Sequence, residues 1–151
     1  MNVIHGIQQL LHDRIVKIPI IANSVGESGK IPVHIWRGSN ITNELEAGLK
    51  RIGFGIIIRP GTFSQIDRSA WLANMRIELQ LNDQFTNSDW GKNVGGWDVA
   101  WKIAEEIHNY SPEGSTSCFY NISITSESPP QRFIEQLTVT ASIQIKTPQK
   151  K

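Results

Sequence analysis

Two acidic residues, Asp67 and Glu78, come closest in this sequence to a set of side chains that could do chemistry. Carboxylates brought together in this way hold a divalent metal that activates water in small metal-dependent nucleases. Gln80 follows Glu78 by two positions, where such sites use a lysine or sometimes a glutamine. Arg76, Glu78 and Gln80 are equally the outward positions of a half-buried strand. We therefore expect Glu78 to lie on a solvated face, and we keep the nuclease as an alternative.

A second candidate is the segment Gly-Glu-Ser-Gly-Lys at residues 26–30. A phosphate-binding loop needs a glycine five places before its Gly-Lys pair and a serine or threonine after the lysine. Ser24 and Ile31 occupy those two places, and the segment is not framed by a clear strand and helix. We interpret residues 23–30 as a polar loop without a phosphate site.

Histidine and cysteine, the usual ligands of zinc, are few and scattered. The four histidines show no ligand spacing: His5, His12, His34 and His108. Structural zinc sites generally use four such ligands. Cys118, the single cysteine, falls inside a predicted strand, where we expect it to be a small buried residue rather than a nucleophile. The sequence thus predicts no catalytic residue, no cofactor and no metal site.

The tryptophans carry more information than the titratable residues. Trp97 and Trp101 fall on one helical stripe and are expected in the core. Trp36 is followed by Arg37, and Trp90 stands near Lys92, in polar or glycine-rich surroundings. Indoles in such surroundings either fold back over the core or anchor contacts with a partner. Both possibilities stay open, and these four residues are our candidates for an oligomer or partner interface.

Composition limits the classes of function. The 151 residues suit one domain, residues 1–151, with a short, frayed basic tail at 147–151. Fifteen basic and fourteen acidic residues give a net charge of +1, which disfavours nucleic acid or an anionic membrane as main partner. One cysteine fits a reducing compartment, and we see no signal peptide and no apolar run long enough to span a bilayer.

The elements that must position these residues follow from hydrophobic periodicity. Strict alternation predicts a strand over residues 75–81 with one wet face, and helical spacing predicts an amphipathic helix over 97–110. The stripe of this helix comprises Trp97, Ala100, Trp101, Ala104, Ile107 and His108. A first helix is expected over 3–16 with Gln8 on its outer side, ended by Pro19.

Further strands are expected on both sides of that strand and helix. Residues 31–36 contain Pro32 and predict an edge strand, whereas residues 54–59 are apolar on both faces and predict a central strand closed by Pro60-Gly61. Residues 118–125 and 137–146 alternate and are expected to pair as a hairpin. A short helix is expected over 42–51. The fold class is therefore α+β, a mixed, largely antiparallel sheet with the helices at 3–16 and 97–110 packed on one face.

The layout of the whole chain resembles the tail terminator, or tail completion, proteins of long-tailed bacteriophages and the related minor tail proteins. The features that carry the resemblance are the N-terminal helix 3–16, the proline-containing strand 31–36, the strand 75–81 leading through a loop to the helix 97–108, and the alternating final strand 137–146.

The resemblance implies a structural virion protein rather than an enzyme. It implies a subunit that closes into a ring, usually a hexamer, on the head-proximal end of the tail tube. The implied partners are other copies of the chain, the tail tube protein and a head-completion or neck protein, with DNA present only as it passes through the lumen. Assembly would occur in the cytoplasm of the host bacterium. A ring subunit is our leading hypothesis, and the alternatives are a nuclease using Asp67 and Glu78 or a ligand-binding adaptor domain.

Overall fold

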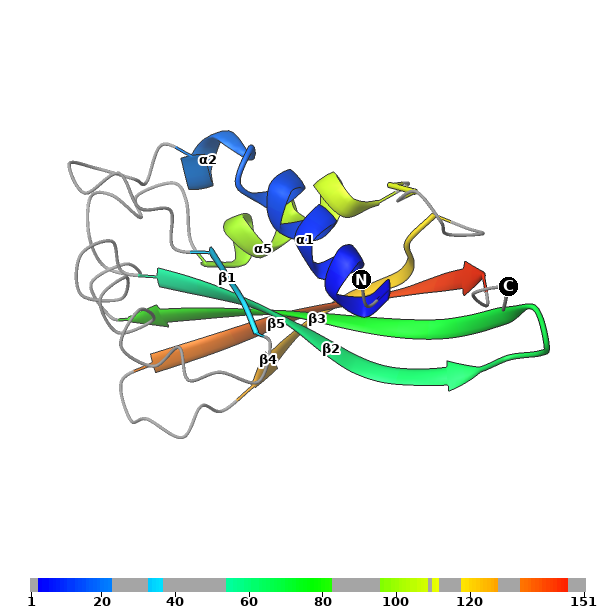
Figure 1. The fold of residues 1–151 in the computed structure, drawn as a ribbon. Helices are drawn as coiled ribbons and strands as arrows, with labels where there is room; N and C mark the ends of the chain where they lie inside the picture. The colour runs from blue at the N-terminus through cyan, green and yellow to red at the C-terminus, as the bar shows by residue number, and fades with distance from the viewer. Residues whose placement is uncertain are drawn as a thin grey trace.

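Both long helices lie on the same face of a five-stranded mixed sheet in the part of the chain that the structure describes (Figure 1). The structure is a computed structural model and describes residues 3–22, 33–36, 54–82, 96–108, 110–111, 118–127 and 134–146. The helices are α1 (Val3–Ile15), the single turn α2 (Pro19–Ala22) and α5 (Gly96–Ile107). The strands are β1 (Val33–Ile35), β2 (Phe54–Gln65), β3 (Ala70–Asn82), β4 (Tyr120–Glu127) and β5 (Ile134–Lys146).

The sheet has the strand order β1-β2-β3-β5-β4. β1 runs parallel to β2, and the other three pairings are antiparallel. The α+β fold class is confirmed, and so are the edge position of the strand after Pro32 and the antiparallel pairing of β4 with β5. β4 forms the opposite edge, which leaves one side of it without a neighbouring strand among the described elements.

The core lies between the sheet and the helices. Ile56 and Ile58 of β2 and Ile77 and Leu79 of β3 are fully buried, with Val139 of β5 beside them. Strands at the centre of a sheet bury such side chains against the helices that cover them. The prediction that residues 54–59 form a central strand, buried on both faces, is confirmed as far as Ile58, since Phe54, Gly55 and Ile57 are buried too.

The prediction that Pro60-Gly61 ends this strand is wrong. β2 continues to Gln65, with a shift in its register to β3 between Pro60 and Phe63. Such a bulge tolerates a residue without an N–H donor. A Cβ on Gly61 would lie 2.9 Å from the carbonyl oxygen of Asn74, so the two strands approach closely only because residue 61 is glycine. The long β2–β3 hairpin then turns at residues 66–69.

Helix α1 follows the predicted pattern with one exception. Ile7, Leu11 and Ile15 are buried against the sheet, as expected. Gln8, expected on the outer side, is fully buried. Its Nε2 donates to the backbone oxygens of Trp36, at 2.8 Å, and Ile58, at 3.1 Å. The amide nitrogen thus satisfies carbonyls at the end of β1 and on β2, whereas the Gln8 Oε1 is buried without a hydrogen-bond partner among the described residues.

Two smaller expectations are also corrected. Pro19 does not simply end the first helix: α1 ends at Ile15, and Pro19 opens α2, which suits a residue without an N–H donor. Cys118 is exposed just before β4, whereas its neighbour Phe119 is buried. The alternation fails because Asn121 has a positive φ of 51° and the β4–β5 register shifts between Tyr120 and Ser123.

Other predictions lie outside the described residues. They are the polar loop at 23–30, the short helix at 42–51, the loop before α5, the turn containing Pro129 and Pro130, and the tail at 147–151.

Substitution of Ile77, at the centre of the sheet, tests the packing of the core. Ile77 pairs with Ile58 on one side and Val139 on the other, and its side chain is fully buried. We expect Ile77→Ala to lower the free energy of unfolding by about 2–5 kcal/mol, measured by urea denaturation, because it removes buried methyl groups and leaves a cavity. Thr125→Ala, on the exposed side of β4, is the control. A loss no larger than that of the control would contradict this packing.

Candidate functional site

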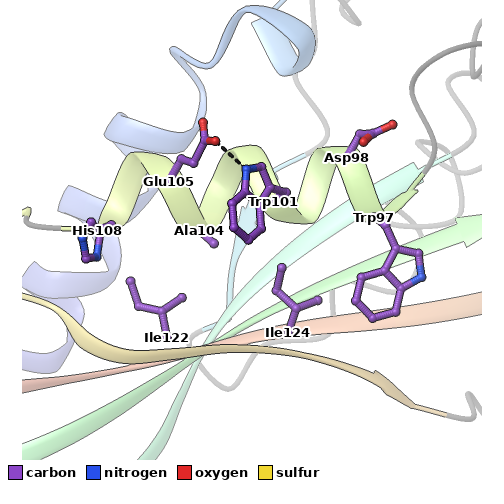
Figure 2. Close-up of a pocket in the computed structure, with 8 residues that line it drawn as sticks. All are labelled: Trp97, Asp98, Trp101, Ala104, Glu105, His108, Ile122 and Ile124. Carbon is purple, nitrogen blue, oxygen red and sulfur yellow. Dashed lines mark hydrogen bonds between the residues drawn. The ribbon is translucent and has the colours of Figure 1, made fainter.

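A groove with a volume of about 810 Å³ lies between α5 and the edge strand β4 (Figure 2). It is lined by Trp97, Asp98, Trp101, Ala104, Glu105, His108, Ile122 and Ile124. Trp97 and Trp101 are 52% and 59% exposed, although both are large apolar side chains. An exposed apolar surface of this kind usually marks a contact site.

The two walls of the groove come from regular elements. On α5, Trp97, Trp101, Glu105 and His108 recur at helical spacing and share one face. On β4, Ile122 and Ile124 are half-buried and point toward the helix, with the exposed Ser123 between them (Figure 2). A helix and an extended strand hold these side chains more firmly than a loop would.

The prediction that Trp97 and Trp101 lie in the core is wrong. Ala100, Ala104 and Ile107 of the predicted stripe are buried as expected, and Val99 and Ile103 are buried with them in place of the two indoles. Two neighbouring stripes of this helix have the same periodicity, and the helix turns the smaller residues toward the sheet. Alanine and valine allow close approach between helix and sheet, whereas an indole would hold them apart. Val99 and Ile103, at helical spacing with Ile107, were the sequence signal for this orientation.

Polar and charged side chains line the rim of the groove. The Trp101 indole Nε1 donates a hydrogen bond to Glu105 (Figure 2). Glu105 also lies 3.8 Å from the ammonium group of Lys102. Asp98 and Glu105 give the rim two carboxylates, and His108 lies at the far end of the same face. The arrangement is an apolar floor with an acidic rim, which is suited to binding rather than to bond breaking.

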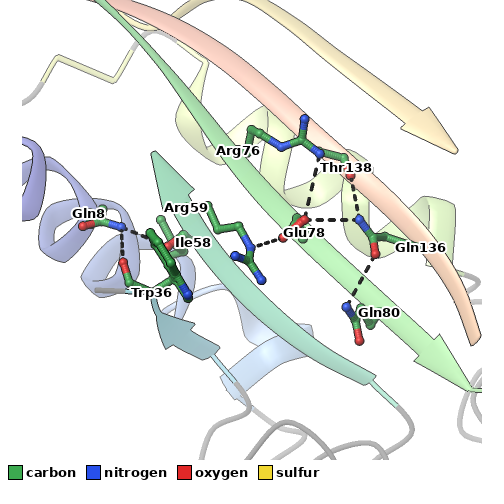
Figure 3. A network of polar contacts seen from close by, with 9 residues as sticks. All are labelled: Gln8, Trp36, Ile58, Arg59, Arg76, Glu78, Gln80, Gln136 and Thr138. Atoms are coloured by element: carbon green, nitrogen blue, oxygen red, sulfur yellow. Dashed lines mark hydrogen bonds and ion pairs between the residues drawn. The ribbon is translucent and has the colours of Figure 1, made fainter. Parts of the chain in front are cut away.

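On the opposite face of the sheet, Glu78 lies at the centre of a polar network (Figure 3). Arg59 is paired with its carboxylate, Arg76 Nη2 lies 3.9 Å from it, and Gln136 Nε2 donates to it at 3.3 Å. The Glu78 side chain is only 10% exposed. The prediction of a solvated glutamate is therefore wrong, because long side chains from β2, β3 and β5 converge on it.

Asp67, the other candidate catalytic residue, lies at the tip of the β2–β3 hairpin. Its Oδ1 accepts hydrogen bonds from the backbone N–H of Ser69, at 2.7 Å, and from the Ser69 hydroxyl, at 2.8 Å. These bonds, the side-chain bond foremost, lower the pKa of Asp67. This is the role of an aspartate that stabilises a turn.

Asp67 and Glu78 do not form one site. The part of β3 from Ala70 to Glu78 spans about 25 Å at the usual rise of a strand, and Asp67 lies beyond Ala70. Within the described parts of the chain, no group of three His, Cys, Asp or Glu residues could hold a metal ion.

Of the predicted interface residues, Trp36 alone lies within the described residues. It is half-buried at the end of β1, and the Cζ atom of Arg59 lies 5.3 Å from the centroid of its ring. Its indole thus contacts the Arg59–Glu78 network, as Figure 3 shows. Arg37, Trp90 and Lys92 lie outside the described residues.

Comparison with known proteins gives information about the fold only. No protein-family model matches the sequence, and no curated protein does either. The structure is similar to a chain of the solved structure "Virion of native gene transfer agent (GTA) particle", with a TM-score of 0.60 and 8% sequence identity. The match covers 97% of this chain and 100% of that one. In the described residues, no helix is both long and apolar enough to cross a membrane.

Removal of the Glu78 carboxylate tests whether the network is structural. We expect Glu78→Ala to lower the free energy of unfolding by about 1–3 kcal/mol, since Arg59 and Gln136 lose a buried partner. The value is moderate because the Arg59 side chain is 35% exposed and solvent screens its charge. Glu105→Ala, which breaks an exposed pair, should change stability by less than about 0.5 kcal/mol. Equal effects of the two substitutions in urea denaturation would contradict a structural role for the network.

Asp67 gives a test that depends on pH. Its folded-state pKa is lowered from 3.8, so its stabilisation of the hairpin is complete above 3.8 and is lost as the pH falls through the lower folded value. Asp67→Ala should therefore destabilise the protein at neutral pH and much less in strong acid, as measured by urea denaturation at both. Asp67→Asn keeps an acceptor for the turn without titrating and serves as the control. A difference between Asp67→Ala and the parent that stays constant with pH would contradict this role.

Proposed function

We propose that this protein is a structural virion subunit of a phage-like particle, which forms a ring on the head-proximal end of the tail tube and joins the tube to the head or neck. The observation that carries the proposal is the similarity of fold, over nearly the whole of both chains, to a chain of a gene transfer agent virion. The layout of the sequence, which resembles the tail terminator proteins, supports the same role. Its partners would be further copies of itself, the tail tube protein and a head-completion or neck protein.

The distribution of polar and apolar groups supports an assembly role. The groove between α5 and β4 exposes two indoles, and tryptophan is enriched among residues that dominate protein interfaces. A ring is built from heterologous contacts, in which one patch of a subunit meets a different patch of the next. We propose that the indoles of Trp36 and Trp90, with Arg37 and Lys92, contribute to contacts with neighbouring copies or with the tube.

The geometry favours this role over the nuclease alternative. The Asp67 carboxylate accepts hydrogen bonds from Ser69 within its turn, and the Glu78 carboxylate is enclosed by two guanidinium groups and an amide. A metal-binding carboxylate needs free lone pairs directed at a shared cation, and these two carboxylates lie at different places along the sheet. A ligand-binding adaptor domain would also use the groove, but the similarity to a virion chain favours assembly.

Self-association of the purified protein tests the proposal. Native mass spectrometry and sedimentation over a micromolar concentration series should find a closed oligomer, with six copies the expected number, and electron microscopy should find rings. Added tail tubes should carry the protein at one end only. Monomers at every concentration, together with no binding to tubes, would overturn the proposal.

A further inference from the structure

The end of the β2–β3 hairpin is a second exposed apolar surface of the described chain. Phe63 and Ile66 are 43% and 49% exposed. The Phe63 ring stacks on that of Trp71 with centroids 4.9 Å apart and planes inclined by 17°, so its position is set by the neighbouring strand. Residues 61–69 are all exposed. We call Phe63, Ile66 and Arg68 the hairpin end.

The hairpin end lies far from the groove of its own chain. β3 pairs with β5 as far as Ala70 and Lys146, and the turn at residues 66–69 extends beyond that pair. In Figure 1 the hairpin projects at one end of the sheet, while α5 begins toward the opposite end. No residue of the hairpin lines the groove. Contact between these two surfaces therefore requires two copies of the chain.

We infer that the hairpin end of one copy docks in the groove between α5 and β4 of a second copy. This inference rests on the proposed ring, and it identifies the surfaces that meet. The groove has the volume of pockets that enclose a drug-sized molecule, so it has room for the side chains of Phe63 and Ile66. Trp97, Trp101, Ile122 and Ile124 would then lose water together with the hairpin end.

Charge also favours this pairing. Arg68 is exposed at the hairpin turn, and the groove carries the carboxylates of Asp98 and Glu105 at its rim. A guanidinium beside an acidic rim sets the orientation of the docked hairpin and disfavours docking of an acidic segment. The two patches differ, so their contact is head-to-tail, and a contact of this kind forms a ring when the rotation from one copy to the next closes the circle.

Complementation between two defective variants tests the inference. Phe63→Ser with Ile66→Ser removes the hairpin end and keeps the groove, and Trp97→Ser with Trp101→Ser does the reverse. Each variant alone should be monomeric, with self-association weakened about a hundredfold or more, because each loses two apolar anchors. An equimolar mixture should form dimers that contain one copy of each, because it retains one intact interface and cannot extend. Native mass spectrometry distinguishes the two variants by mass.

Matched controls separate docking from folding. Ser64→Ala with Gln65→Ala changes exposed residues of the same strand, and Thr125→Ala changes an exposed residue of β4 that does not line the groove. Both should assemble like the parent, and all variants should retain its circular dichroism spectrum. Should one of the serine variants fail to fold, cross-linking keeps the inference testable. With Cys118→Ser, the pair Arg68→Cys and Asp98→Cys should give a ladder of disulfide-linked oligomers, whereas either cysteine alone should not.

The outcomes separate this inference from the proposed function. If the parent forms rings and the hairpin variant still forms them, the ring is real and the hairpin does not dock in the groove. Loss of association in the groove variant alone would mean that another segment occupies the groove, which also overturns the inference. If rings form but no cross-links appear between positions 68 and 98, the hairpin does not dock in the groove and the inference is overturned. Parent protein that stays monomeric throughout overturns the ring itself.

Discussion

The contact between the small-residue stripe of α5 and the sheet is the constraint on which the rest of this structure depends. Val99, Ala100 and Ala104 bring the helix close to β5 and β4, while Ile103 and Ile107 fill the space beside them. Since the stripe uses small residues, the helix presents its largest side chains, Trp97 and Trp101, to the side. The groove is therefore a direct consequence of how the core is packed.

The N-terminal helix α1, which lies beside α5 on the same face of the sheet, also helps to hold α5 in place. Arg14 Nε donates to the backbone oxygen of Glu106 at 3.0 Å, and its Cζ atom lies 4.2 Å from the centroid of the Tyr110 ring. Gln8 binds carbonyls of Trp36 and Ile58, at the end of β1 and on β2. α1 thus links the C-terminal end of α5 to the edge of the sheet that lies furthest from the groove. Such bonds from one helix to separate elements hold the two layers in one relative position.

The polar network around Glu78 shows why a buried carboxylate is a weak indication of catalysis. Its charge is balanced by Arg59, with Arg76 nearby, and Gln136 occupies a further lone pair. A group enclosed in this way stabilises the arrangement of β2, β3 and β5 and has little capacity left for a metal ion. Among the described residues, exposed apolar side chains gather at the groove and at the hairpin end, and this agrees with the proposed role in assembly.

Taken by itself, the sequence determined the fold class, the first helix, the edge strand, the central strand and the final hairpin. Each of these follows from local alternation or helical spacing, which is a property of neighbouring residues. Its assignment of Trp97 and Trp101 to the core was wrong, since both are exposed, and its choice of Trp36 and Trp90 as interface residues stays a prediction. The position of α5 was predicted correctly, and so was the burial of Ala100, Ala104 and Ile107. The other members of the predicted stripe are exposed: Trp97, Trp101 and His108.

Only the tertiary structure decided whether Val99 and Ile103 or Trp97 and Trp101 are buried beside Ala100, Ala104 and Ile107, because that choice depends on the room between the layers rather than on periodicity. It likewise decided that Gln8 and Glu78 are buried, since their partners lie at Trp36, Ile58, Arg59 and Gln136, far along the chain. The bulges near Pro60 and Asn121 interrupt the alternation of each strand because the register to the partner strand shifts there. The groove exists only where α5 meets β4, so no single stretch of sequence could specify it.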